Sequence, residues 1–158
     1  MVEANDQHWA GGREARRIAD QLERSWRGPA WHGPSLHEVL KEIDEAKAQR
    51  RPLASAHTIW ELLLHISTWE RASLARVRGQ EFTPTDGENF PAPSGSWSEA
   101  IAAADRLHDE LVAEVKTLAD DVLWEPAPGC PYNKYFLLHG VVQHNLYHAG
   151  QITILAKD

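Results

Sequence analysis

The sequence contains a single cysteine, Cys130, among its 158 residues. One thiol cannot form a disulfide within the chain, and it cannot build a zinc site that needs two or more thiolates. The sequence therefore excludes a disulfide-stabilised small fold and a cysteine-based zinc site. A chain of this length can instead bury a hydrophobic core of its own, and we expect a single domain over residues 1–158.

Long apolar runs and an excess of basic charge are also missing. No run approaches the ~18 residues of a membrane span, and the first residues lack the apolar stretch of a signal peptide. Lys and Arg number 16 against 23 Asp and Glu, a formal net charge of −7. Because nucleic acids are bound by basic protein surfaces, we expect no nucleic-acid partner. The missing apolar runs lead us to expect no membrane partner and a cytoplasmic location. Residues 1–11 are expected to form a mobile tail.

No alternating run is long enough to predict a strand, and helical periodicity dominates. Apolar residues at helical spacing predict four long helices over residues 13–27, 58–79, 96–118 and 133–156, with a shorter helical segment over 36–49. Capping boxes mark two of the starts, at Thr58–Glu61 and at Ser96–Glu99. We therefore predict an all-α, four-helix bundle with long connecting loops, which we expect to cover one end.

Nine histidines and seven tryptophans stand out, because a helical scaffold requires neither excess. His144 and His148 lie four residues apart in the middle of the apolar face of the last predicted helix. Side chains at that spacing converge on one point. Burying two imidazoles is costly without partners, and a metal ion would satisfy both. Such pairs are also common on helices that bind no metal, so a third ligand is needed from another helix.

His65 is the candidate third ligand. It lies immediately beside the apolar face of the helix predicted to begin at Thr58, on the stripe formed by Glu61, His65 and Trp69. Three histidines from two helices of a bundle leave coordination positions open, which is typical of catalytic rather than structural zinc sites. Imidazole suits several divalent metals, and we expect zinc or nickel.

Five further residues are candidates for the surroundings of this triad. A metal-bound imidazole donates its free N–H to an acceptor, which Glu61 or Gln151 could provide. For Glu61 we favour the capping box, which explains the residue by itself. The other candidates for pocket positions are Trp69, Asn145 and Trp31.

The remaining histidines are assigned by position. His139 precedes His148 by nine residues, about two and a half turns, so it is expected on the opposite side of the helix, facing away from the triad. His57 precedes the helix cap, and we favour a structural loop residue over one near the metal. The surface is the expected place for the other four: His8, His32, His37 and His108.

Three motifs resemble the DinB-like (DinB/YfiT) superfamily of metal-binding four-helix proteins. They are WHGPS at residues 31–35, HTIWELLLHI at 57–66 and, most specific, LHGVVQHNLYHAGQI at 138–152. The resemblance implies a metal triad at His65, His144 and His148, the residues that helix geometry also selects. Relatives often carry aspartate after the first histidine of the last helix, where this sequence has Asn145.

The resemblance also implies a function. Characterised relatives include enzymes that use a low-molecular-weight thiol such as bacillithiol or mycothiol, in S-transfer or in maleylpyruvate isomerisation, and homodimers are frequent. We therefore expect a thiol-dependent S-transferase that acts on small electrophiles and activates its thiol with a metal ion. Cys130 has no base beside it in sequence, so the thiol would come from outside. Two alternatives stay open: a metal-dependent hydrolase, and a non-catalytic metal- or ligand-binding stress protein.

Overall fold

The structure is a computed structural model that describes residues 12–157, so the predicted tail over 1–11 lies outside the described residues. Its four long helices are α1 (Arg13–Trp26), α4 (Ile59–Val77), α6 (Trp97–Thr117) and α7 (Lys134–Leu155). Four short elements complete it: α2 (Leu36–Lys41), α3 (Glu45–Gln49), α5 (Asp86–Asn89) and the 3-10 helix η1 (Val122–Trp124). The described residues contain no strand, and the predicted all-α fold is confirmed.

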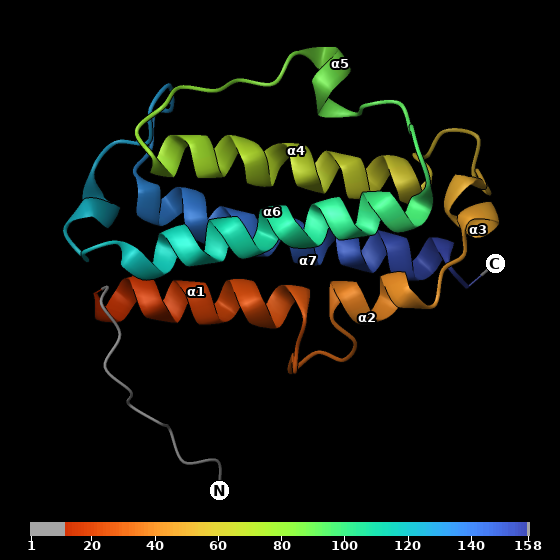
Figure 1. Cartoon of the computed structure of the whole chain (residues 1–158), viewed down its shortest axis with the longest axis horizontal. Coiled ribbons are helices and arrows are strands. Elements are labelled where there is room, and N and C mark those ends of the chain that lie inside the picture. The colour runs from red at the N-terminus through yellow and green to blue at the C-terminus, as the bar shows by residue number, and fades with distance from the viewer. Residues whose placement is uncertain (1–11, 158) are drawn as a thin grey trace, which may run out of the picture.

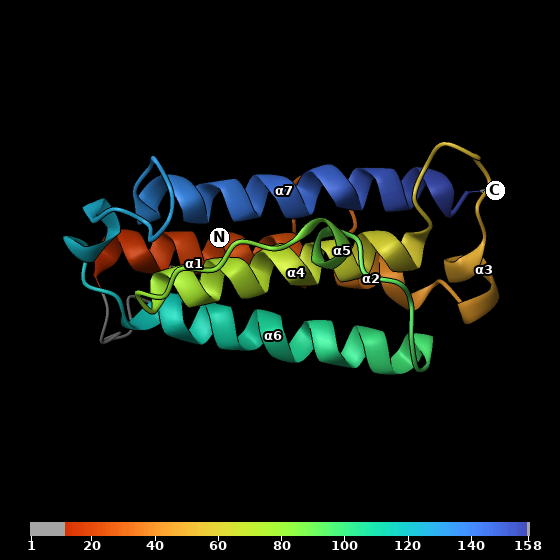
Figure 2. The ribbon, with the colours of Figure 1, turned by 90° about the horizontal axis from the view of Figure 1, so that it is seen from above.

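The four long helices form the bundle. Figure 1 shows them side by side, and α1 and α4 each pack against both α6 and α7. The connection from α4 to α6 is long and carries α5, and it runs back along α4 in both ribbon views (Figures 1 and 2). None of the helices within residues 12–157 is long and apolar enough to cross a membrane.

Side-chain caps set where α4 and α6 begin. The Thr58 hydroxyl accepts a hydrogen bond from the backbone N–H of Glu61 at 3.1 Å, and the Glu61 carboxylate accepts one from that of Thr58 at 2.8 Å. Ser96 and Glu99 form the same pair at the start of α6. Both predicted capping boxes are therefore confirmed. Each cap satisfies donors that the first turn leaves free and stabilises the helix by about 1 kcal/mol.

Two segments differ from the prediction. The helix expected over residues 36–49 is divided into α2 and α3, because Asp44 accepts the backbone N–H of Lys47 at 2.8 Å and starts a new helix there. Aspartate competes with helical hydrogen bonding in this way and favours caps over helix interiors. The segment expected to be a loop over 80–95 contains α5, which starts at a further capping box between Thr85 and Glu88.

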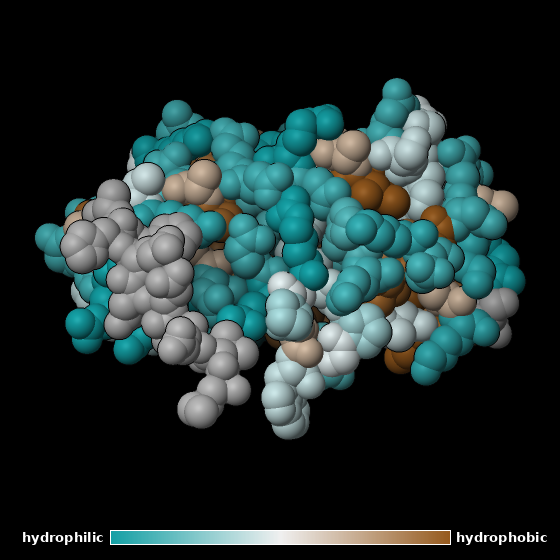
Figure 3. All heavy atoms as spheres, turned by 60° about the horizontal axis from the view of Figure 1, so that its bottom comes forward, coloured by the Kyte–Doolittle hydropathy of each residue, from teal (hydrophilic) through white to brown (hydrophobic). Residues whose placement is uncertain are grey.

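The apolar faces of the helices form two buried clusters, one toward each end of the bundle. Along α7, Val141 belongs to one cluster and Ala149 to the other. The stretch between these two residues, which carries His144 and His148, therefore lies where the clusters meet. The surface in Figure 3 is mainly hydrophilic, with hydrophobic residues in small separate groups, as expected when amphipathic helices turn their apolar stripes inward.

One surface assignment was wrong: His108 is completely buried. It lies on the apolar stripe of α6, four residues after Ala104 and three before Leu111, so helical spacing already pointed inward. Its ring stacks on Trp26 with centroids 4.5 Å apart. His37 is half-buried, whereas His32 is exposed as predicted. His8 lies outside the described residues.

Candidate metal centre

Three histidines from α4 and α7 meet inside the bundle. His144 Nε2 lies 3.0 Å from His65 Nε2 and 3.1 Å from His148 Nε2. All three potential ligand atoms lie within 4.8 Å of one another. His65 and His148 are buried, while His144 is partly exposed. The structure thus brings together the three residues selected from helix spacing.

Hydrogen bonds behind two of the rings determine which nitrogen faces the centre. His65 Nδ1 lies 2.7 Å from the backbone carbonyl of Asn89, and His148 Nδ1 lies 2.6 Å from Oε1 of Gln151. Carbonyl oxygens only accept hydrogen bonds, so both Nδ1 atoms carry the ring proton. Each Nε2 atom therefore directs a lone pair toward His144.

His144 cannot satisfy both lone pairs. A neutral imidazole has one N–H, so at most one of the two contacts at its Nε2 is a hydrogen bond. Nitrogen ligands lie about 2.0–2.1 Å from a zinc ion, which places neighbouring ligands roughly 3 Å apart. The two separations that involve His144, 3.0 Å and 3.1 Å, are close to that spacing, and all three nitrogens lie within 4.8 Å of one another. The donor set and its geometry therefore fit a divalent metal ion.

The surroundings keep the three imidazoles uncharged. Burial, helped by the neighbouring charges of His148 and His65, lowers the pKa of His144 to about 3. Burial also lowers the pKa of His65 and of His148, against the opposing effect of their hydrogen bonds to Asn89 and Gln151. All three rings are therefore neutral at pH 7, which is the form that binds metals.

Two aromatic rings border the triad. Phe90 stacks on His65 with centroids 4.0 Å apart, and His57 stacks on the same Phe90 ring at 3.7 Å. Trp69 lies edge-on to both His65 and His144, at 6.4 Å from each. The sequence did not predict the roles of Phe90 and Asn89. Asn89 and Phe90 lie 24 and 25 residues after His65, and no local sequence pattern indicates that this connection folds back onto His65.

Asn89 connects two of these side chains. Its backbone carbonyl accepts from His65, and its side-chain oxygen accepts the Trp69 indole N–H at 2.9 Å. The α5 segment therefore positions a triad ring and the neighbouring indole together. Helices α4 and α5 contact one another along this segment.

The other candidate residues take different positions. Gln151 hydrogen-bonds a triad histidine, as described above, whereas Glu61 bonds to Thr58 and to the Arg51 guanidinium at 2.7 Å. Within residues 12–157, no hydrogen bond joins Glu61 to the triad. Trp31 is fully exposed, and no described ring or hydrogen-bond contact joins it to the triad. The ring of His139 packs against Tyr135 at 4.4 Å instead of joining the centre.

Asn145 belongs to a buried polar network rather than to the triad. Its amide donates to Glu70 Oε1 at 2.8 Å, and His108 Nδ1 lies 2.9 Å from the same oxygen. All three side chains are almost completely buried. The network ties α4, α6 and α7 together next to His144, so it sets the register of the helices that supply the three histidines.

Comparison with known protein families adds an independent observation. The sequence model of the DinB superfamily matches residues 30–152, which include the whole of α4 and all three histidines of the triad. No curated protein matches the sequence. The match covers well over half of the chain and agrees with the all-α bundle and its histidine cluster. The chain therefore belongs to the DinB superfamily.

Proposed function

We propose that this protein is a metal-dependent S-transferase that joins a low-molecular-weight thiol to small electrophiles. The observation that carries the proposal is the convergence of lone pairs at the triad, where His65 and His148 both face His144 Nε2. These three residues would hold one divalent ion, and their nitrogen donors suit zinc or nickel. Such an ion lowers the pKa of a thiol bound to it, so that a thiolate is present at neutral pH.

The residues around the triad support this assignment by orienting the ligands. Asn89 and Gln151 hold two of the rings in one tautomer, and outer partners of this kind typically change metal affinity 10–100-fold. Phe90 stacks on His65 and Trp69 lies edge-on to His144, so aromatic rings border the centre. His144 is the partly exposed member of the triad.

The thiol would come from outside the protein. Cys130 is the sole cysteine, and its side chain lies near that of Tyr132 in the loop that precedes α7. Among the described residues, no contact joins Cys130 to a triad histidine. We place the activity in the cytoplasm, where low-molecular-weight thiols are kept reduced.

A conjugation assay tests the proposed function. The metal-loaded protein is mixed with a panel of low-molecular-weight thiols and small electrophiles, and thioether formation is followed by mass spectrometry. We expect acceleration that requires both metal and thiol, that His65→Ala abolishes and that His32→Ala leaves unchanged. Turnover of substrates without any thiol would indicate a hydrolase, and full metal loading with no turnover across the panel would indicate a binding protein. Either result would contradict the proposal.

We also propose a homodimer formed through the outer face of α7, which lies along one edge of the bundle (Figure 2). Phe136, Tyr147 and Ile154 are large hydrophobic residues on this helix, exposed to 64%, 66% and 69%. Together with Gly140 and Gly150 they form one stripe along the helix. Successive members of the stripe are 4, 7, 3 and 4 residues apart, which keeps them on the same helix face. An added Cβ at either glycine would meet no atom within 4 Å, so the stripe is open.

The occupant we infer is a second copy of the chain. Residues 135–156 contain no Asp, Glu, Lys or Arg, although the whole chain carries a net charge of −7. Two such acidic molecules repel one another, and an uncharged apolar stripe lets them meet without bringing carboxylates together.

Charge placed on the stripe should separate the dimer. The double variant Phe136→Glu, Ile154→Glu is expected to sediment as a monomer where the unaltered protein sediments as a dimer, because four glutamates would face one another across the interface. Leu53→Glu is the control, since Leu53 is also an exposed hydrophobic residue but lies outside α7. A monomeric unaltered protein, or a double variant that stays dimeric, would refute this interface.

A further inference from the structure

Arg76 is a buried cation without a counter-charge. It lies near the C-terminal end of α4 and is only 4% exposed. Its Nε and Nη1 atoms are enclosed, and neither has a hydrogen-bond partner in the described part of the chain. Nor does any carboxylate within residues 12–157 form an ion pair with it. The guanidinium carbon lies 5.9 Å from the centroid of the Trp69 ring.

This arrangement lacks an anion. A guanidinium remains charged at every physiological pH, and removing that charge from water costs far more than one aromatic face returns. Bound water could accept the free N–H groups but would not neutralise the charge. Proteins retain such destabilising groups where function needs them. The missing partner is therefore a negatively charged ligand.

The position of Arg76 relates this ligand to the histidine triad. Residues 65, 69 and 76 are separated by four and seven positions, so they lie on one face of α4. The Trp69 ring contacts the guanidinium at 5.9 Å and the His144 ring at 6.4 Å. A single indole thus separates Arg76 from the triad, and the two sites are within the reach of one small molecule.

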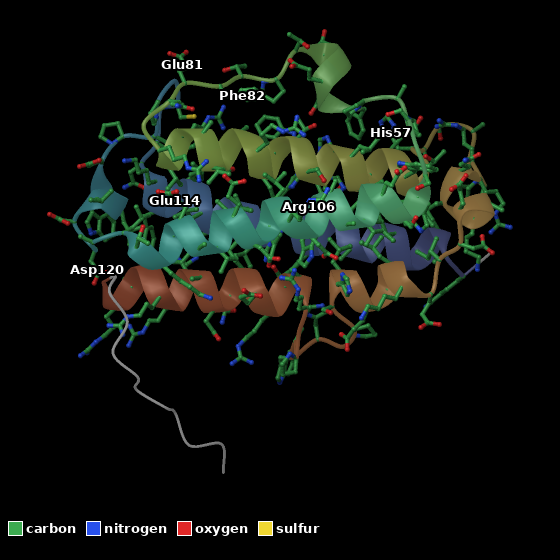
Figure 4. The ribbon with its side chains drawn as sticks, in the orientation of Figure 1. His57, Glu81, Phe82, Arg106, Glu114 and Asp120 are labelled. Carbon is green, nitrogen blue, oxygen red and sulfur yellow. The ribbon has the colours of Figure 1, made fainter. Side chains whose placement is uncertain are left out.

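Other elements also meet near Arg76. The Tyr132 phenol, from the loop before α7, lies close enough to Arg76 for the two side chains to interact electrostatically. Glu81 and Phe82 lie on the segment above this end of α4 (Figure 4). Glu81 approaches Gly129 in the loop that also carries Tyr132, so the two segments close over this end of the helix.

We propose that Arg76 binds the carboxylate of the thiol cosubstrate, whose sulfur end reaches the histidine triad. The planar guanidinium offers paired N–H donors that match two carboxylate oxygens, and charge-assisted bonds of this kind are strong in buried surroundings. That the other end is a thiol rests on the proposed function. The anion site itself stands on the burial and isolation of Arg76 alone.

Calorimetric titration with matched probes tests the proposal. The metal-loaded protein is titrated with 4-mercaptobutyrate, with its neutral amide 4-mercaptobutyramide, and with butyrate, which carries no thiol. We expect 4-mercaptobutyrate to bind about tenfold or more tightly than the amide, and Arg76→Met to remove this preference without changing affinity for the amide. Arg106→Met, which alters an exposed arginine on α6, should keep the preference (Figure 4).

The outcomes separate the anion site from the proposed function. Equal binding of butyrate and 4-mercaptobutyrate, with both weakened by Arg76→Met, would support the anion site and contradict the thiol function. An Arg76→Met protein that binds both anions like the unaltered protein would overturn the anion site. Without ligand, Arg76→Met should unfold at a higher temperature, because an apolar side chain replaces an unpaired buried charge. A lower unfolding temperature would show that Arg76 supports the fold, and would also refute the proposal.

Discussion

Replacing His144 by alanine will abolish stoichiometric metal binding. His144 Nε2 is the atom that both other ligand nitrogens approach, at 3.0 Å and 3.1 Å. Its loss leaves two nitrogens, one on each of two helices, and removes the atom between them. Because the outer partners of metal ligands already change affinity 10–100-fold, we expect loss of a ligand to cost more than about 100-fold. Elemental analysis of protein purified without a histidine tag measures the effect.

His139→Ala is the matched control for this experiment. His139 lies on the same helix, one turn and a half from His144, but packs against Tyr135 and belongs to no part of the triad. The control protein should keep one metal ion per chain, and its circular dichroism should match that of the His144→Ala protein. A His144→Ala protein that still carries one ion per chain would show that the metal site lies elsewhere.

Glu70→Ala is expected to give the largest loss of stability, about 3–5 kcal/mol in the free energy of unfolding. The Glu70 carboxylate is 1% exposed and accepts hydrogen bonds from Asn145 and His108 on two other helices. Without it, both donors remain buried and unpaired, and a cavity opens between three helices. Urea unfolding followed by circular dichroism measures the change.

Two further variants test the cause of that loss. Glu70→Gln keeps an acceptor oxygen and should lose less stability than Glu70→Ala. Glu110→Ala removes the Glu110–Arg78 ion pair at the surface of α6, 2.8 Å long, and should cost less than about 1 kcal/mol. If Glu70→Ala were as mild as Glu110→Ala, the buried network would not hold the three helices together.

Much of the fold follows from chemistry that acts over a few residues. Thr58 and Ser96 begin their helices because their hydroxyls cap the first turn, and the glutamates three positions later complete the caps. The spacing of His144 and His148 places both rings on one helix face, whatever the rest of the chain does. The four long helices and the grouping of the three histidines were therefore predictable. The division at Asp44 was not, because apolar periodicity continues across it while the aspartate cap interrupts the backbone hydrogen bonds.

The sequence alone determined the all-α bundle and the three histidines, because capping and periodicity depend only on near neighbours. Only the tertiary structure showed that the backbone carbonyl of Asn89 accepts a hydrogen bond from His65 and that His108 and Asn145 meet at Glu70. The burial of Arg76 without a counter-charge is likewise visible only in the tertiary structure. These features depend on which distant segments pack together, and the free energy that decides such packing is shared by the whole core rather than carried by any local pattern.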